Sequence, residues 1–257
     1  MEDKKEMVMT NVAKELGVQS FCFRGFKNNE EVIEKVKECG LDRIELCGVH
    51  VDFGDEGSFD EVIDQYHSNG VKIVSIGVNG FANDEQKERK LFEFAKKAGI
   101  KAMSANFSID AMPDCLNTAT KLADEYDINL AIHNHGGRHW LGNAATLKHV
   151  FSKTSPRIGL SLDTAWALDS RENPVEWVKM FGDRLYGVHF KDFIFDKSGK
   201  PEDVVVGTGN LALEELIEEM RKADFSGFAV LEYEADVDNP VPALKKCVDA
   251  VKAAAGK

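Results

Sequence analysis

Short apolar runs alternate along this chain with longer segments that mix apolar and charged residues. The apolar runs are LGVQSFCF, RIELC, VKIVSIGV, KAMSANF, NLAIH, IGLSLD, RLYGVHF and GFAVLEY. Each is rich in β-branched or large apolar residues and bounded by turn residues, as buried strands are. The pattern predicts about eight strands, each followed by a longer segment.

These longer segments show the period of amphipathic helices, most clearly at residues 28–40, 84–99 and 211–225. In the first of them the apolar residues share one helical face, and Gly40 provides a helix stop. Strands that alternate with helices pair in parallel through right-handed crossovers. We expect an α/β fold, a single (β/α)8 TIM barrel, with an open doubly wound sheet as the alternative.

Length and composition bound the rest. The 257 residues suit one barrel domain over 1–257, with residues 1–15 as an N-terminal extension. The formal net charge of -12 repels phosphate backbones and makes nucleic acid a poor partner. The five cysteines form no CxxC pair, and no signal-peptide core or membrane-length apolar run is present. We expect a cytoplasmic protein with no membrane partner, and a homo-oligomer stays open.

Polar residues at the ends of the later strands indicate the chemistry. NLAIH ends in His133, IGLSLD in Asp163, the GVH run in His189 and FAVLE in Glu232. A lone residue of this kind would be a hydrogen-bonded strand end. Four of them at equivalent positions converge if the barrel closes, because the carboxyl ends of its strands form the active-site face. Two imidazoles and two carboxylates suit a divalent metal ion such as Mn, Zn, Co or Fe, with Mg also open.

The segments AIHNHGG, LSLDTAW, GVHFKD and VLEYE resemble the signature segments of the xylose isomerase-like TIM barrels. That family, which shares the AP endonuclease family 2 fold, includes sugar phosphate isomerases/epimerases, inosose dehydratases and the endonuclease IV branch. The resemblance runs in order over nearly the whole chain. It includes Glu45 in the second strand and the GTGN turn before the seventh helix.

The resemblance implies a metal set of Asp163, His189 and Glu232. The first ligand of the family is usually a glutamate that ends the fifth strand, where this sequence has His133. In the family's epimerases, metal-bound glutamates of the fifth and eighth strands exchange a proton between two faces of a carbon. The HNH segment looks more like the inosose dehydratase type, which favours β-elimination, hydration or isomerisation over 3-epimerisation.

A mechanism follows from these residue types. The metal would bind a carbonyl oxygen and a neighbouring hydroxyl of the substrate and stabilise an enediolate. Glu232, Glu234 and His135 are candidate bases for the proton next to the carbonyl. Lys191 shares a strand face with His189, and could polarise the oxygen or, if burial lowers its pKa, transfer a proton. The alternative for Lys191 is a solvated salt bridge with Asp192 on the rim.

Other polar and aromatic residues near the strand ends are candidate substrate contacts. With Glu234, they are Glu45, Asn79, Asn106, Arg138 and Trp166. Each also has a structural alternative; Glu45 could be a buried partner of Arg43 or of a loop amide. Phe21, Phe23, Arg24 and Trp140 could contribute to the same pocket. GTGN has no adjacent cation for a phosphate, so the sequence favours an unphosphorylated keto-sugar, cyclitol or oxidised glycoside.

Rival functions have weaker support. VVVGTGNLALEEL resembles a dinucleotide fingerprint, but the chain after Glu232 is too short to complete a nucleotide-binding sheet. A phosphodiesterase like the endonuclease IV branch needs more His and carboxylate ligands and a basic face for DNA, and seven histidines and a net charge of -12 argue against it. A non-catalytic barrel that binds carbohydrate or protein is the alternative of another class. The sequence favours a metal-dependent sugar isomerase or epimerase, with a dehydratase or lyase of the same family as the alternative.

Overall fold

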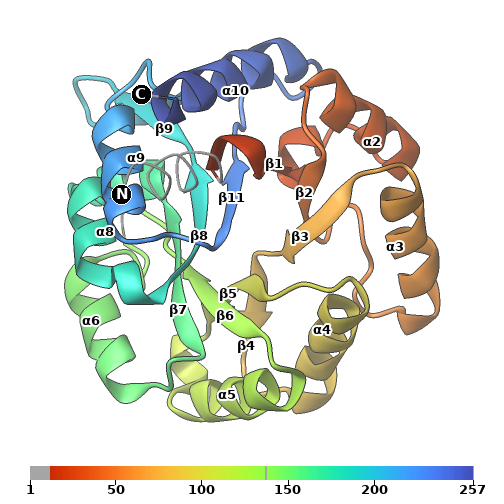
Figure 1. Ribbon diagram of the computed structural model, residues 1–257. Helices are drawn as coiled ribbons and strands as arrows, with labels where there is room; N and C mark the ends of the chain where they lie inside the picture. Colours follow the sequence, from red (N-terminus) through yellow and green to blue (C-terminus); the bar gives the residue numbers. More distant parts are fainter. Residues whose placement is uncertain (1–11, 137, 257) are drawn as a thin grey trace, which may run out of the picture.

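A computed structural model describes residues 12–136 and 138–256. Parallel strands lie at its centre and helices surround them (Figure 1). The strands are β1 (Leu16–Gln19), β2 (Arg43–Leu46), β3 (Lys72–Ile76), β4 (Asn79–Phe81), β5 (Ala102–Phe107), β6 (Asn129–His133), β7 (Ile158–Asp163), β8 (Leu185–Phe190) and β11 (Phe228–Leu231). Of the extension expected over residues 1–15, residues 1–11 lie outside the described part.

The sheet order is β3-β2-β1-β11-β8-β7-β6-β5-β4, with parallel pairing throughout. β3 and β4 are two segments of one barrel strand, interrupted at Gly77 and Val78. Gly77 N donates to Leu46 O of β2 at 2.9 Å. A Cβ on Gly77 would lie 2.4 Å from the Cβ of Ser104 in β5, so only glycine permits this approach. The barrel therefore closes at the third strand, and the predicted TIM barrel is confirmed.

The outer ring consists of helices α2 (Asn29–Glu38), α3 (Phe59–Ser68), α4 (Glu85–Lys97), α5 (Asp114–Tyr126), α6 (Ala144–Lys153), α8 (Pro174–Phe181), α9 (Leu213–Lys222) and α10 (Val241–Ala255), with the short α7 (Thr164–Asp169) after β7. Side chains fix several helix starts: Asn28 accepts from Glu30 N, and Asp84 from Lys87 N. The three helices predicted most clearly are present. No described helix is long and apolar enough to cross a membrane.

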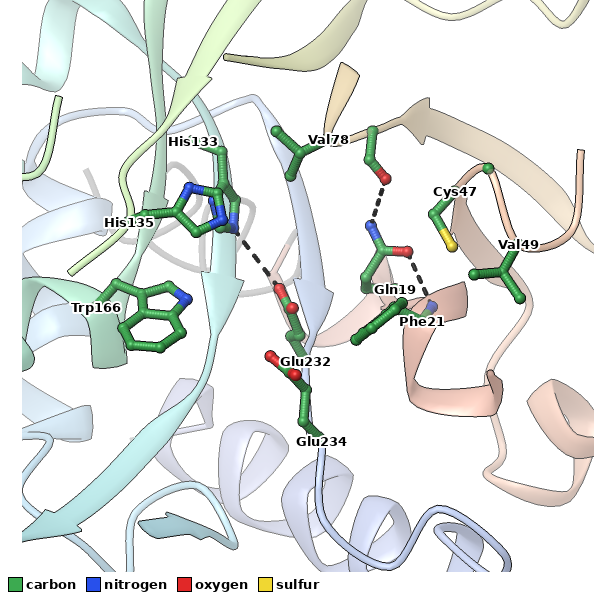
Figure 2. Close-up of a pocket in the computed structure, with 12 residues that line it drawn as sticks. Gln19, Phe21, Cys47, Val49, Val78, His133, His135, Trp166, Glu232 and Glu234 are labelled. Atoms are coloured by element: carbon green, nitrogen blue, oxygen red, sulfur yellow. Dashed lines mark hydrogen bonds and ion pairs between the residues drawn. The ribbon is translucent and has the colours of Figure 1, made fainter. Parts of the chain in front are cut away.

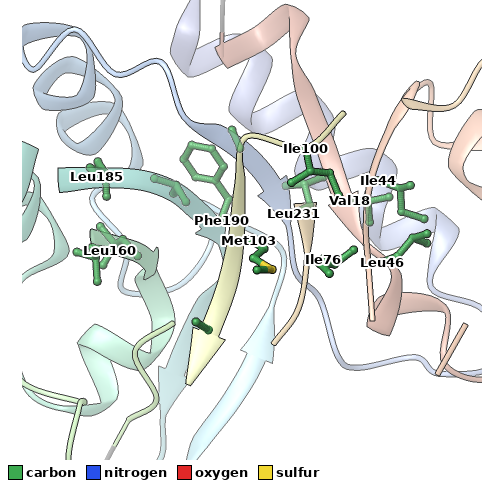
Figure 3. Close-up of a cluster of buried hydrophobic side chains, with 14 of the residues drawn as sticks. Val18, Ile44, Leu46, Ile76, Ile100, Met103, Leu160, Leu185, Phe190 and Leu231 are labelled. Atoms are coloured by element: carbon green, nitrogen blue, oxygen red, sulfur yellow. The ribbon is translucent and has the colours of Figure 1, made fainter. Parts of the chain in front are cut away.

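The core is continuous from the barrel interior to the helices. Buried side chains of several strands fill it (Figure 3), including Val18, Ile44, Ile76, Met103 and Leu231. Each such side chain contributes about 1.5–3 kcal/mol when it is fully buried. All five cysteines are buried and unpaired. The strands carry apolar residues on both faces because one face meets the interior and the other meets the helices.

An antiparallel hairpin between β8 and α9 was not predicted. It consists of β9 (Asp192–Phe195) and β10 (Pro201–Val204). The carboxylate of Asp192 accepts hydrogen bonds from the backbone of Gly207, Gly209 and Leu211. GTGN is thus the turn before α9, as expected, and Asp192 is buried in it instead of exposed on the rim.

Candidate metal centre

Four polar side chains meet at the carboxyl ends of four neighbouring strands. They are His133 of β6, Asp163 of β7, His189 of β8 and Glu232, which follows β11. One ligand atom from each lies within 4.8 Å of the others, and all four residues are buried. The structure brings together the four residues that the sequence named for a metal.

The contacts inside this cluster are short. His133 Nε2 lies 3.2 Å from His189 Nδ1, 3.5 Å from Asp163 Oδ2 and 3.7 Å from Glu232 Oε2. His189 Nδ1 lies 2.5 Å from Glu232 Oε2. The four groups therefore face one common point from four strands.

Local structure fixes the orientation of Asp163. The side chain of Asn134 donates to Asp163 O at 2.9 Å and accepts from Asp163 N at 2.8 Å. Asp163 Oδ1 accepts from Trp166 N at 2.8 Å and caps α7. Asp163 Oδ2 is buried without a hydrogen-bond partner among the described residues. Because an unpartnered buried carboxylate oxygen is costly, it is available for a ligand.

The histidines and carboxylates of the cluster favour each other's charged forms. Burial alone would lower the pKa of His189, but Glu45 and Glu232 outweigh it and raise the pKa to about 10. Burial and His189 would lower the pKa of His133, but Asp163 and Glu232 raise it. Burial would raise the pKa of Glu232, but Lys191 and the two histidines hold it well below its ordinary value. Positive charge is therefore favoured at this point.

The residues fit a divalent cation. Two imidazole nitrogens and two carboxylate oxygens around one buried point suit zinc, manganese, cobalt or iron. Asp163 Oδ2 supports the same conclusion, because it lies in the cluster 3.5 Å from His133 Nε2 and has no hydrogen-bond partner among the described residues.

Lys191 lies beside the cluster and is buried, with 1% of its surface exposed. Its Nζ pairs with Glu234 and lies 3.6 Å from Glu232 and 3.8 Å from Asp203. Burial would lower the pKa of Lys191, but Glu232 and the other surrounding carboxylates raise it. The expected solvated position on the rim is wrong, because Lys191 is buried, and the surrounding acidic groups favour the charged form of its ammonium group.

A cavity of about 440 Å³ opens beside the cluster (Figure 2). Its lining consists of Gln19, Phe21, Cys47, Gly48, Val49, Gly77, Val78, His133, His135, Trp166, Glu232 and Glu234. Trp166 forms part of one wall, and Lys191 Nζ lies 5.3 Å from its ring centre. None of these lining residues is a lysine or an arginine, so the wall offers no cation for a phosphate group.

His135 enters the cavity from the loop after β6. Its ring lies 4.7 Å from that of His133 and 6.2 Å from that of Trp166. Burial and the neighbouring His133 lower the pKa of His135 to about 4. The imidazole is therefore neutral near pH 7 and able to accept a proton.

Several predicted substrate contacts lie elsewhere. Glu45 is fully buried and binds side chains of the barrel interior, so neither substrate contact nor a pair with Arg43 describes its position. Arg43 pairs with Asp42 at the other end of the strand. Among the described residues, Asn79, Asn106 and Arg138 are not part of the cavity wall. Asn79 is buried and Arg138 is exposed.

The other aromatic and basic candidates divide in the same way. Phe21 lines the cavity, whereas Phe23 is fully buried in the core. Arg24 donates to the backbone of Phe21 and of Glu234, and so joins two rim segments. Trp140 Nε1 donates to Phe107 O at 3.0 Å, which ties the loop after β6 to β5.

Sequence reasoning missed Gln19, Asn134 and Asp203. Gln19 ends β1 and Asn134 directly follows β6, so the strand-end criterion used for the metal ligands could have found both. Asp203 belongs to β10 of the unpredicted hairpin. It approaches Lys191 and accepts from Glu234 N at 3.0 Å. The hydrophobic pattern of the sequence gives no indication that Asp203 lies near the barrel strands.

Residues 33–254 match the profile of the Xylose isomerase-like TIM barrel. The chain belongs to this family. The matched span includes the whole cluster around His133 and Glu232, and it begins within α2, after β1.

Characterised relatives of this chain include inosose dehydratases. The one from Bacillus velezensis is 30% identical over 51% of this chain and 50% of its own length. Inosose dehydratase 2 from Bacillus cereus is 24% identical over 67% of this chain and 61% of its length. The chain thus matches about half to three fifths of the length of these relatives.

Solved structures share the fold. The probable 3-DHS dehydratase AsbF from Bacillus anthracis has a TM-score of 0.73 at 17% identity and covers 92% of this chain and 98% of its own. The 3-keto-D-glucoside 4-epimerase YcjR from E. coli has a TM-score of 0.69 at 16% identity, over 93% and 99%. The IOLI protein, with a bound zinc atom, has a TM-score of 0.72 at 18% identity, over 92% and 98%.

Proposed function

We propose that this protein is a metal-dependent enzyme that removes a proton next to a carbonyl group of an unphosphorylated sugar-like substrate. The observation that carries the proposal is the cluster of His133, Asp163, His189 and Glu232 beside a cavity that also holds Glu234. A divalent ion held by the four residues would act as a Lewis acid that acidifies the carbon next to the carbonyl.

The remaining residues of the cavity supply proton transfer and charge. Glu234 lines the cavity without belonging to the cluster, and it is our first candidate for the base; His135 is the second. Lys191 keeps its positive charge close to Glu232 and Glu234, so it acts through these two carboxylates and holds Glu234 in position. Trp166 and Val49 provide apolar surface for the carbon face of a sugar ring.

We favour a dehydratase over an isomerase or epimerase. An epimerase needs a base on each face of the carbon, but the cluster has an imidazole, His133, where the family's first glutamate stands. A single base on one face suits elimination: Glu234 takes the proton from carbon, a carbon–carbon double bond forms, and the departing hydroxyl leaves as water with that proton. The similarity to inosose dehydratases supports this choice, with a keto-cyclitol or keto-sugar as substrate.

The substrate is proposed to lack phosphate. The cavity lining contains no lysine or arginine, and the GTGN amides already bind the carboxylate of Asp192. The phosphodiesterase alternative needs ligands for several ions, and the described residues contain one suitable cluster.

The test combines metal analysis with proton exchange. The protein is loaded with Mn, Co or Zn, its metal content is measured by mass spectrometry, and keto-cyclitols, keto-sugars and 3-keto-glycosides are incubated with it in D2O. A new enone absorbance with loss of water indicates a dehydratase, and deuterium incorporation without it indicates an isomerase or epimerase. Absence of both with a metal-loaded protein contradicts the proposal and favours a carbohydrate-binding barrel.

A further inference from the structure

Glu45 is a buried carboxylate that the proposed reaction does not use. It lies in β2 with no exposed surface, and its Oε2 lies 2.7 Å from His189 Nε2 in β8. β1 and β11 separate these two strands in the sheet, so the pair spans the barrel interior. A buried carboxylate costs several kcal/mol unless its charge is matched.

Three neutral donors hold this carboxylate in place. Gln19 Nε2 donates to Oε2 at 2.7 Å, Ser75 Oγ donates to Oε1 at 2.8 Å, and Ser104 Oγ donates to Oε1 at 2.6 Å. They come from β1, β3 and β5, so three strands fix the position of Glu45. His189 is its ion-pair partner among the described residues.

The two nitrogens of His189 face different surroundings. Nδ1 faces the cluster, 2.5 Å from Glu232 and 3.2 Å from His133. Nε2 faces Glu45 on the enclosed side at ion-pair distance, but the two groups are not aligned as a hydrogen bond. A neutral imidazole that binds a metal uses one nitrogen as the ligand and carries its proton on the other. The group that accepts this proton determines which of the two nitrogens binds the metal.

We infer that Glu45 is a positioning residue for the metal centre: its carboxylate holds the proton on Nε2 of His189 and leaves Nδ1 for the metal. The inference rests on the proposed metal centre. It gives the half of the barrel that carries no ligand an indirect part in metal binding, since Gln19, Ser75 and Ser104 act on His189 through Glu45.

The first test compares Glu45→Gln with Glu88→Gln. Glu88 is also buried, at 1% exposure, but it accepts from Ala82 N and Asp84 N at the start of α4, away from the cluster. Dissociation constants for Co²⁺ are measured by chelator competition at one pH. We expect about a 10- to 100-fold weaker binding in Glu45→Gln, in line with the usual effect of losing a partner of a ligating histidine, and no change in Glu88→Gln.

Two further measurements cover the case in which Glu45→Gln does not fold. Ser104→Ala removes one donor to Glu45 and keeps its charge, so we expect a smaller, few-fold loss of Co²⁺ affinity. In the zinc-loaded wild type, nitrogen-15 NMR of the imidazoles reports the tautomer of each histidine. We expect a metal-bound Nδ1 and a protonated Nε2 for His189.

The outcomes separate this inference from the proposed function. If the wild type binds no divalent ion, the metal centre itself is wrong. If the wild type binds Co²⁺ and Glu45→Gln binds it equally well, or if His189 carries its proton on Nδ1, the role of Glu45 is wrong while the metal centre stands.

Discussion

The two halves of the barrel mouth differ in charge although their strands are built alike. β6, β7, β8 and β11 bring His133, Asp163, His189 and Glu232 to the cluster, of which His133 and Glu232 line the cavity, whereas β1 to β5 bring mainly neutral groups such as Gln19. We call these the charged half and the neutral half. Their strands share the same period and the same apolar core. The chemistry therefore depends on the residues at the strand ends and not on the fold of either half.

Glu45 is the exception that clarifies this comparison. It belongs to a strand of the neutral half, yet it pairs with His189 of the charged half. Ser75 and Ser104 are not part of the cavity wall, whereas the Gln19 side chain is; all three support a carboxylate that serves the opposite half. The neutral half both shapes the cavity and, as proposed, orients the metal centre.

The largest effect is expected from Asp163→Ala in the charged half. This change removes Oδ2 from the cluster and Oδ1 from the cap of α7, so the metal is lost. We expect kcat/KM to fall on the order of 10³-fold or more, because the Lewis acid contributes several kcal/mol to the transition state. Metal content and turnover are measured together. Asp124→Ala, an exposed partner of Arg157, is the control; metal retention in Asp163→Ala would contradict the cluster.

Lys191→Met should lower turnover without loss of the metal. The substitution keeps the length of the side chain but removes the charge next to Glu232 and Glu234. We expect kcat to fall about 10²-fold, which is the lower range for general acid–base catalysis, because Glu234 loses the ion pair that positions it. Glu234→Gln, measured beside it, should lower kcat by a similar factor if Glu234 is the base. Unchanged kcat in both variants would place the proton transfer at His135.

In the neutral half, Val49→Ala should change binding and leave the chemistry intact. Val49 lines the cavity away from the cluster and offers apolar contact only. We expect KM to rise about tenfold with kcat unchanged, because the loss of small apolar groups weakens ground state and transition state equally. A large fall in kcat with unchanged KM would show that the neutral half takes part in the chemical step.

The smallest effect is a pH dependence of stability in the metal-free protein. His189 has a pKa raised from 6.5 to about 10, so its stabilising proton is fully present below pH 6.5 and is lost as pH rises towards 10. We expect Tm to fall between pH 6.5 and 9; above pH 9.0 the buried thiols, such as Cys22, add their own effect. Thermal denaturation at several pH values, with and without Zn²⁺, measures this change of Tm. His189→Gln should reduce the dependence of Tm on pH, and an equal dependence in both proteins would contradict the positive charge assigned to His189.

The alternation of apolar runs and amphipathic segments was sufficient to predict the barrel. The strand NLAIH and the helix over residues 85–97 lie where the sequence pattern predicts them. A strand buried on both faces is a short apolar run, and a helix buried on one face has apolar residues at helical spacing. Because the carboxyl ends of parallel strands lie at one edge of the sheet, the last residues of the apolar runs also predicted that four side chains meet: His133, Asp163, His189 and Glu232. The role of these four as ligands remains a proposal.

Only the tertiary structure decided the positions of Glu45, Lys191 and Asp203. The period of a strand shows that residue 45 faces inward, but not that Ser75 and Ser104 from other strands surround it. The charge of Lys191 depends on Asp203 from a hairpin that carries no barrel period, and on Glu234 from the segment that follows β11, far along the chain. A residue pattern records how each segment meets the core. The pKa and the partner of a buried polar group depend on which distant segments lie within a few ångströms of it, and folding alone determines that.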